Sequence, residues 1–162
     1  MAVGRSVEKN PRDAGVEKAN YYVYQVGSGM LDGAVCGKVF ASPSSTQIFE
    51  TMKAVSTDHR GILLIVKNYS GDRLHFGTAC ERAKRELDQD VQMVLVEEDC
   101  AIPRPRIRGT GRRGLAGTVL VHKVAGAAAR HGNSLAEVAR RANLVANSIG
   151  TVGVALPSCS VS

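Results

Sequence analysis

The stretch that decides the fold is residues 61–96, "GILLIVKNYSGDRLHFGTACERAKRELDQDVQMVLV". It opens with an unbroken apolar run over residues 62–66, which is typical of a parallel strand covered on both faces. Apolar residues then recur at spacings of three and four, so a helix is expected over residues 72–87. A second buried strand is expected at residues 91–96. Strand, helix and strand in so short a length predict a right-handed βαβ unit with parallel strands.

The flanking sequence adds further elements of the same α/β kind. A Gly-rich segment comes before this unit, and a loop rich in Arg, Pro and Gly follows it over residues 97–114. Ser134 is expected to open a helix through a capping box with Glu137, because a Glu three residues after a Ser is the signature of that motif. The remaining expected elements are a short helix at 43–54, a helix at 115–130, the helix at 134–149 and a short strand at 152–156.

Composition narrows the class of protein. The 162 residues fit one domain with a real core. Aromatic residues make up 4% with no Trp, which argues against a base-stacking nucleic-acid platform, although the net charge of +6 leaves open an anionic partner or a solvated basic surface. The four cysteines have no CxxC spacing, so we expect reduced thiols and no metal site. No apolar stretch is long enough for a signal peptide or a membrane helix, and a cytoplasmic location is expected.

The candidate site lies where the first strand meets the following helix. In an open α/β sheet, ligands bind beyond the carboxyl ends of the strands, and helix N-termini favour anions or polarised oxygens there. Lys67 and Asp72 stand at this place and could both reach a small polyol. The alternative is structural: Asp72 could be the N-cap of the helix, worth about 1 kcal/mol, and Lys67 could extend into solvent. Spacing alone leaves both interpretations open.

Three other features of the sequence are weaker candidates for a functional site. The Arg-rich loop is a candidate for nucleic-acid contact, but its Pro, Gly and lack of aromatics favour an ordinary solvated loop. His122 stands alone in a mostly apolar helix, which is typical of a packed or surface histidine. The segment "VGSGMLDG" at 26–33 lacks both the GK[ST] ending and the full GxGxxG pattern of phosphate-binding loops.

Four segments together carry a family resemblance. They are "GSGMLDGAVCGKVFASPS", "GILLIVKNYSGDRLHFGTACERA", "GRRGLAGTVLVHKVAGAAA" and "VGVALPSCSVS". In this order they resemble the substrate-binding K domain of dihydroxyacetone (glycerone) kinases, the DhaK family. The resemblance implies a layered α/β/α sandwich with a largely parallel sheet built from βαβ units. Residues 26–162 would form part of that domain, and the divergent residues 1–25 a loose N-terminal tail.

The resemblance also implies an activity and its participants. Such a K domain binds dihydroxyacetone, which is phosphorylated to dihydroxyacetone phosphate. The phosphoryl group would come from ATP with Mg, held by a separate L-type domain or subunit, or from a phosphotransferase relay. Lys67 and Asp72 match the family's triose contacts, and Asp72 matches its proton acceptor. A homo-oligomer is implied for the complete family protein, with no membrane and no nucleic acid as partner.

The sequence departs from the family at its two histidine motifs. The covalent His belongs to a Gly-x-Gly-Ile-His-Gly-Glu motif, which these residues do not contain. A second family His lies in a Gly-rich loop expected near residues 12–20, where "RDAGVEKAN" places Lys18 instead. His122 matches neither position. We therefore expect a K domain truncated at both ends, with impaired activity and uncovered apolar surface. The alternative is a non-catalytic interaction or regulatory fragment that pairs with a full-length K domain.

Overall fold

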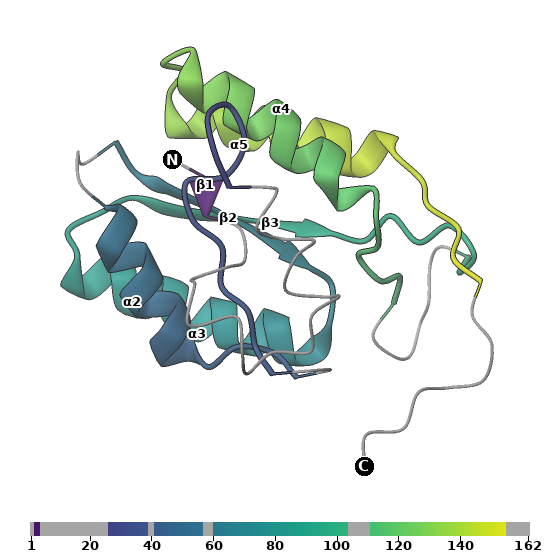
Figure 1. The fold of residues 1–162 in the computed structure, drawn as a ribbon, viewed down its shortest axis with the longest axis horizontal. Helices are drawn as coiled ribbons and strands as arrows, with labels where there is room; N and C mark the ends of the chain where they lie inside the picture. The colour runs from purple at the N-terminus through teal and green to yellow at the C-terminus, as the bar shows by residue number, and fades with distance from the viewer. Residues whose placement is uncertain (1, 4–25, 39–40, 57–59, 104–110, 155–162) are drawn as a thin grey trace.

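The computed structural model describes residues 2–3, 26–38, 41–56, 60–103 and 111–154. The elements are the strands β1 (Ala2–Val3), β2 (Ile62–Lys67) and β3 (Val91–Val96), and the helices α2 (Ser45–Val55), α3 (Ser70–Glu86), α4 (Thr118–Arg130) and α5 (Leu135–Ser148). Figure 1 shows their arrangement. The predicted helices and the two main strands are confirmed, with boundaries that differ by a few residues.

The three described strands form one parallel sheet in the order β1-β2-β3. β2 and β3 pair along their whole length, from Ile62 opposite Val91 to Lys67 opposite Val96. Helix α3 connects them, so the predicted parallel βαβ unit is confirmed.

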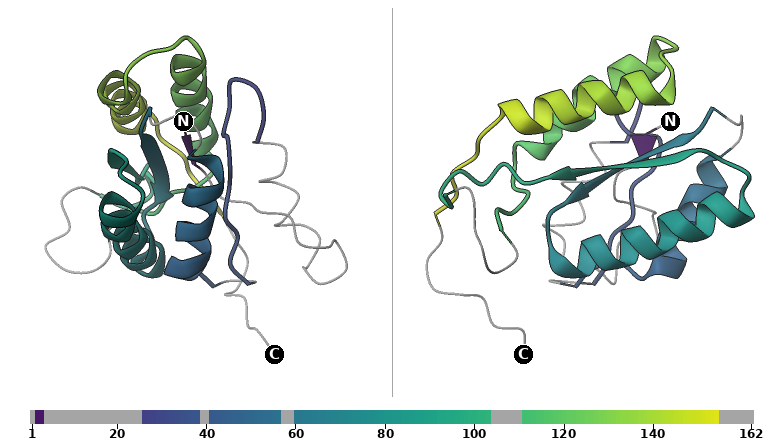
Figure 2. Two further views of the ribbon diagram at one scale, coloured as in Figure 1. Left: turned by 90° about the vertical axis from the view of Figure 1, so that its left-hand side faces the viewer. Right: turned by 180° about the vertical axis from the view of Figure 1, so that it is seen from behind.

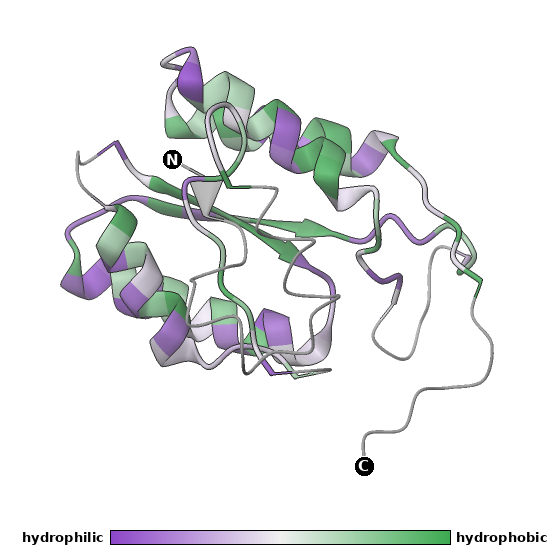
Figure 3. Ribbon diagram, in the orientation of Figure 1, coloured by the Kyte–Doolittle hydropathy of each residue, from purple (hydrophilic) through white to green (hydrophobic). Residues whose placement is uncertain are grey.

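Helices cover both faces of the sheet. Helices α2 and α3 lie on one face and α4 and α5 on the other, as the views in Figures 1 and 2 agree. Leu63 and Ile65 of β2 belong to the core beneath α4 and α5. Ile62 and Leu64 belong to the core beneath α2 and α3. Successive residues of a strand point to opposite faces, which explains why the first strand needs an unbroken apolar run (Figure 3). The predicted α/β/α sandwich is confirmed.

Two expected strands differ from the structure. The strand at residues 91–96 is not fully buried, because β3 lies at the edge of the described sheet and exposes Gln92 and Met93. The strand expected at 152–156 is absent over 152–154, and the rest of that range lies outside the described residues. Instead, Thr151 forms an isolated bridge with Asp99.

The helix starts follow the capping signals in the sequence, with one correction. Helix α2 begins with a full capping box between Ser44 and Gln47. At α5 only half of the predicted box forms: the backbone N–H of Glu137 donates to Ser134 Oγ at 3.4 Å. The Glu137 carboxylate instead pairs with two arginines in the following turn, at 2.6 and 2.7 Å.

The remaining expectations concern the N-terminal segment and the composition. Residues 2 and 3 form the strand β1, whereas a loose tail was expected over residues 1–25. Residues 4–25 lie outside the described part, so the domain boundary at residue 26 stays a prediction. Three cysteines, Cys36, Cys80 and Cys100, are in the thiol form and not in disulfides. Among the described residues, no helix is both long and apolar enough to cross a bilayer.

Candidate functional site

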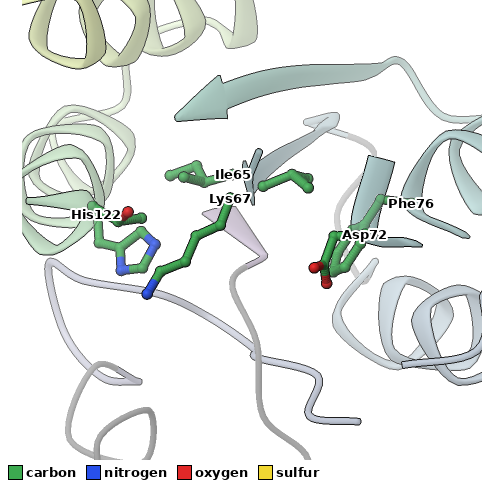
Figure 4. Close-up of a pocket in the computed structure, with 7 residues that line it drawn as sticks. Ile65, Lys67, Asp72, Phe76 and His122 are labelled. Atoms are coloured by element: carbon green, nitrogen blue, oxygen red, sulfur yellow. The ribbon is translucent and has the colours of Figure 1, made fainter. Parts of the chain in front are cut away.

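A small cavity lies at the carboxyl end of β2, between the two helical layers (Figure 4). Its volume is about 20 Å³, roughly enough for one water molecule, so a larger ligand would bind at its mouth. Lys67 and Asp72, the two candidate site residues, both line this cavity. Its lining comes from three elements: Ile65, Val66 and Lys67 of β2, Asp72 and Phe76 of α3, and Thr118 and His122 of α4.

Asp72 is positioned by the first turn of α3. The sequence left open that Asp72 is the N-cap, but Tyr69 occupies that position and Asp72 lies three residues further on. Its side chain is buried, with 6% of its surface exposed. A carboxylate in the first turn is stabilised by the helix dipole. Asp72 therefore supports the helix end from inside the first turn and also faces the cavity.

The start of α3 is fixed by the segment that precedes α2. A Cβ added at Gly71 would lie 2.7 Å from Ser42 Oγ, so the two segments are in close contact. His75 Nδ1 lies 2.6 Å from the Pro43 carbonyl oxygen. A carbonyl only accepts, so the His75 ring must donate from Nδ1. These contacts hold the turn that carries Asp72.

Lys67 is held by the loop that leads into α4. A Cβ added at Gly114 would lie 2.6 Å from the Val96 carbonyl oxygen, 2.8 Å from Lys67 Cβ and 2.9 Å from Lys67 Cα. Only a glycine lets the loop pass this close to the strand ends. The base of the Lys67 side chain is therefore fixed between the sheet and this loop.

Two arginines of the Arg-rich loop have structural partners. The Arg112 carbonyl oxygen accepts a hydrogen bond from Asn68 Nδ2 at 2.6 Å. The Arg112 guanidinium donates a hydrogen bond to the Ile102 carbonyl oxygen at 2.6 Å. Arg113 donates to the Asn68 carbonyl at 3.4 Å and lies over the ring of Tyr69, 5.3 Å from its centre. The other three arginines, at 104, 106 and 108, lie outside the described residues.

His122 is a site residue that the sequence pattern did not predict. It is buried, with 3% of its surface exposed, and Figure 4 shows Lys67 extending toward its ring. Burial, and then the charge of Lys67, lower the pKa of His122 to about 4. One feature of the sequence could have indicated His122, namely its place near the start of a helix. In a parallel sheet the helix that follows a strand begins near the carboxyl end of that strand, so the first turns of α4 lie at the site. Thr118, one turn earlier, lines the same cavity.

The glycine-rich segment at residues 26–33 lies elsewhere. Its turn packs against α4, where a Cβ added at Gly126 would lie 2.1 Å from the Met30 carbonyl oxygen. A larger cavity of about 580 Å³ lies beside this turn and is lined by Arg60 and Arg130. Arg60 precedes β2, so this second cavity is at the amino end of the strand, away from Lys67.

We assign no nucleotide or magnesium site to the described residues. Within the described ranges, no three His, Cys, Asp or Glu side chains gather as a metal ligand set. Magnesium in kinases is held by carboxylates and substrate phosphates. The cavity offers one carboxylate, Asp72, so we derive no step through ATP from this part of the chain.

Comparison with known proteins identifies the family. The model of the Dak1 domain matches residues 21–162, and the chain belongs to this family. The triokinase/FMN cyclase of Mus musculus is 51% identical over 137 residues, which cover 84% of this chain and 23% of that protein. The dihydroxyacetone-binding subunit DhaK of PTS-dependent dihydroxyacetone kinase 1 from Listeria innocua is 48% identical over 136 residues, 84% of this chain and 40% of that subunit.

Solved structures agree with the fold. The dihydroxyacetone kinase from C. freundii, in complex with AMP-PNP and Mg²⁺, matches with a TM-score of 0.70 and 42% identity over 90% of this chain and 24% of that chain. The dihydroxyacetone kinase operon co-activator Dha-DhaQ matches with a TM-score of 0.65 and 32% identity over 75% of this chain and 36% of that chain. The chain spans less than half the length of each of these proteins.

Proposed function

We propose that this chain supplies the triose contacts of a dihydroxyacetone kinase K domain, with Lys67 and Asp72 binding dihydroxyacetone. The observation that carries the proposal is the convergence of these two side chains on one cavity at the carboxyl end of β2. They come from different elements and bear opposite charges. This arrangement suits a small polyol, because the ammonium group donates hydrogen bonds and the carboxylate accepts them.

Asp72 would act as the proton acceptor. Its carboxylate takes the proton of the attacking triose hydroxyl while that oxygen forms a bond to phosphorus and the donor's P–O bond breaks. Phosphoryl transfer depends on positioning and charge stabilisation, so a carboxylate that orients the nucleophile is the contribution expected of the protein. The Lys67 ammonium would hold a second oxygen of the triose and fix its orientation.

The phosphoryl donor would be bound by another domain or subunit of the L type. It would be ATP with Mg or a phosphotransferase relay. This proposal is supported by the relatives, which include a separate dihydroxyacetone-binding subunit of a PTS-dependent kinase. These 162 residues contain neither family histidine motif, so impaired activity of the chain by itself is part of the proposal.

The test is direct binding of dihydroxyacetone by calorimetry. We expect Asp72→Asn and Lys67→Met to weaken binding at least tenfold, the order expected for losing a hydrogen bond to a charged group. Asp90→Asn is the matched control, because Asp90 is exposed and lies before β3, at the opposite end of the sheet. If the wild-type chain shows no binding, or if all three variants bind equally, the proposal is wrong.

A second candidate function is regulatory. The match to the co-activator Dha-DhaQ indicates that this fold also occurs in a protein named for regulation. Large apolar side chains are exposed on the helices, among them Leu74, Leu120 and Leu144. In this case the chain would pair with a full-length K domain without catalysing transfer. Co-purification with such a domain, unaffected by Asp72→Asn, would favour this candidate.

A further inference from the structure

Three side chains from three elements face the cavity: Lys67 from β2, Asp72 from α3 and His122 from α4. In Figure 4 the Lys67 side chain extends toward the His122 ring, and Asp72 lies across from it on the other side. We propose that His122 is a positioning residue, which holds the Lys67 ammonium group at the mouth of the cavity. The inference rests on the proposed function in one respect, that Lys67 contacts the triose.

The ring of His122 is carried by a rigidly packed part of α4. At the start of the helix, a Cβ on Gly117 would lie 2.7 Å from Thr151 Oγ1. Further along, a Cβ on Gly126 would lie 2.1 Å from the Met30 carbonyl oxygen. Side chains of Thr151 and Glu98 therefore pack closely at the start of α4, and the Met30 backbone packs on the helix after His122, so the helix that carries the ring is closely packed on both sides of it. The imidazole forms a fixed wall of the cavity.

A fixed wall beside Lys67 matters because lysine is a long side chain with several rotatable bonds, and a neighbouring ring restricts where the ammonium group can lie. Gly114 packs on the Cα and Cβ of Lys67, and three further torsions set the position of the ammonium group. A lysine whose end is not fixed loses conformational entropy when it binds a ligand. Contact with a buried ring lowers that cost in advance, so the ammonium group is placed before the triose arrives.

The charge state of His122 suits this role. Burial and the neighbouring Lys67 lower the pKa of His122 to about 4, so the imidazole is neutral at physiological pH. A neutral ring has one nitrogen that accepts a hydrogen bond, whereas a charged ring would repel the ammonium group. The charged groups that line the cavity with it are Lys67 and Asp72. In Figure 4 the neutral ring lies beside the ammonium group, and the Asp72 carboxylate lies across from them.

The first test needs no triose. His122 is titrated by NMR on the full chain, with its signal assigned by its loss in His122→Gln. We expect a midpoint below pH 5 in the wild type, and a rise of at least half a unit in Lys67→Met. Lys123→Met is the matched control, because Lys123 is the exposed neighbour on α4, and the midpoint should stay unchanged. A wild-type midpoint near 6.5, or equal midpoints in the two lysine variants, would overturn the proposal.

The second test measures positioning itself. Carbon-13 relaxation of the Lys67 side chain should show greater motion in His122→Leu than in the wild type, and His122→Gln should restore much of the order. In a double-mutant cycle on dihydroxyacetone binding, His122→Leu should weaken binding several-fold alone and have no effect in the Lys67→Met background. Unchanged Lys67 motion, or additive effects, would contradict the positioning role. If the wild type binds no triose, the proposed function fails while the relaxation test still decides this inference.

Discussion

Gly114 lies directly against Lys67, so close that a Cβ at position 114 would be 2.8 Å from Lys67 Cβ. The same Cβ would be 2.6 Å from the Val96 carbonyl oxygen. The loop before α4 therefore rests on the ends of β2 and β3. Gly114 thus packs on Lys67 four residues before α4 begins at Thr118.

Gly114→Ala should destabilise the protein. The added methyl group meets backbone and the base of a side chain, neither of which can move easily, so a cost of about 1–3 kcal/mol is expected in the free energy of unfolding. Chemical denaturation measures it. The matched control is Gly77→Ala in α3, where a Cβ meets nothing within 4 Å. It should instead gain up to about 1 kcal/mol from helix propensity. Equal stabilities of the two variants would contradict the close packing at Gly114.

The stability of the fold should fall as the pH drops below about 6.5, in part because of His122. In the unfolded chain this residue binds a proton near pH 6.5, but in the folded protein its pKa is about 4. The unfolded state therefore binds more protons between these values, and stability rises with pH across this window. Between pH 6.5 and 5 the contribution is about 2 kcal/mol. His122→Gln should remove this part of the slope in denaturation curves; an unchanged slope would show that His122 is not buried neutral.

Glu98 should stabilise the junction between β3, α4 and the segment after α5. Its carboxylate is fully buried and accepts from the Leu115 N–H at 2.8 Å and from Thr151 Oγ1 at 3.3 Å. Glu98→Ala leaves these donors without that acceptor, at a cost of about 1–3 kcal/mol. In a double-mutant cycle with Thr151→Val the effects should be non-additive, because the two side chains share a hydrogen bond. Strict additivity would argue against the network.

The chain by itself should phosphorylate dihydroxyacetone little or not at all when mixed with ATP and Mg²⁺. The 162 residues contain neither histidine motif of the family, and the described part has no magnesium ligand set. A coupled assay for dihydroxyacetone phosphate measures this directly. Adding an L-type subunit with its donor is the informative comparison. Robust turnover by the purified chain with ATP alone would contradict the expectation that the donor is bound elsewhere.

Much of the fold could be predicted because the apolar run at residues 62–66 demands cover on both faces, and the next helix and strand follow closely. Which strand lies at the edge of the sheet is harder to predict. Gln92 and Met93 of β3 are exposed because no described strand lies beyond β3, and a short apolar segment alone does not reveal its neighbours. Helix α3 begins at Ser70, two residues before the predicted start at residue 72. The Ser-Gly pair at residues 70 and 71 is typical of a turn between elements, but here it forms the first turn of the helix.

The candidate site could be predicted only where its residues are close in sequence. Lys67 and Asp72 flank one turn, so the rule for parallel sheets places both at the same edge. His122 lies 50 residues after Asp72, and its side chain reaches the cavity because α4 packs closely at Gly117 and Gly126. Such contacts depend on tertiary packing, which the apolar pattern of the helix does not specify.

Dihydroxyacetone should bind at the carboxyl end of β2, at the cavity that Lys67 and Asp72 line. Titration of the ¹⁵N-labelled chain with dihydroxyacetone, followed by amide chemical shifts, tests it most directly. We expect saturable shifts clustered at residues 67–73 and 114–122, which are lost in Asp72→Asn. No saturable shifts, or shifts confined to the second cavity near Arg60 and Arg130, would contradict it.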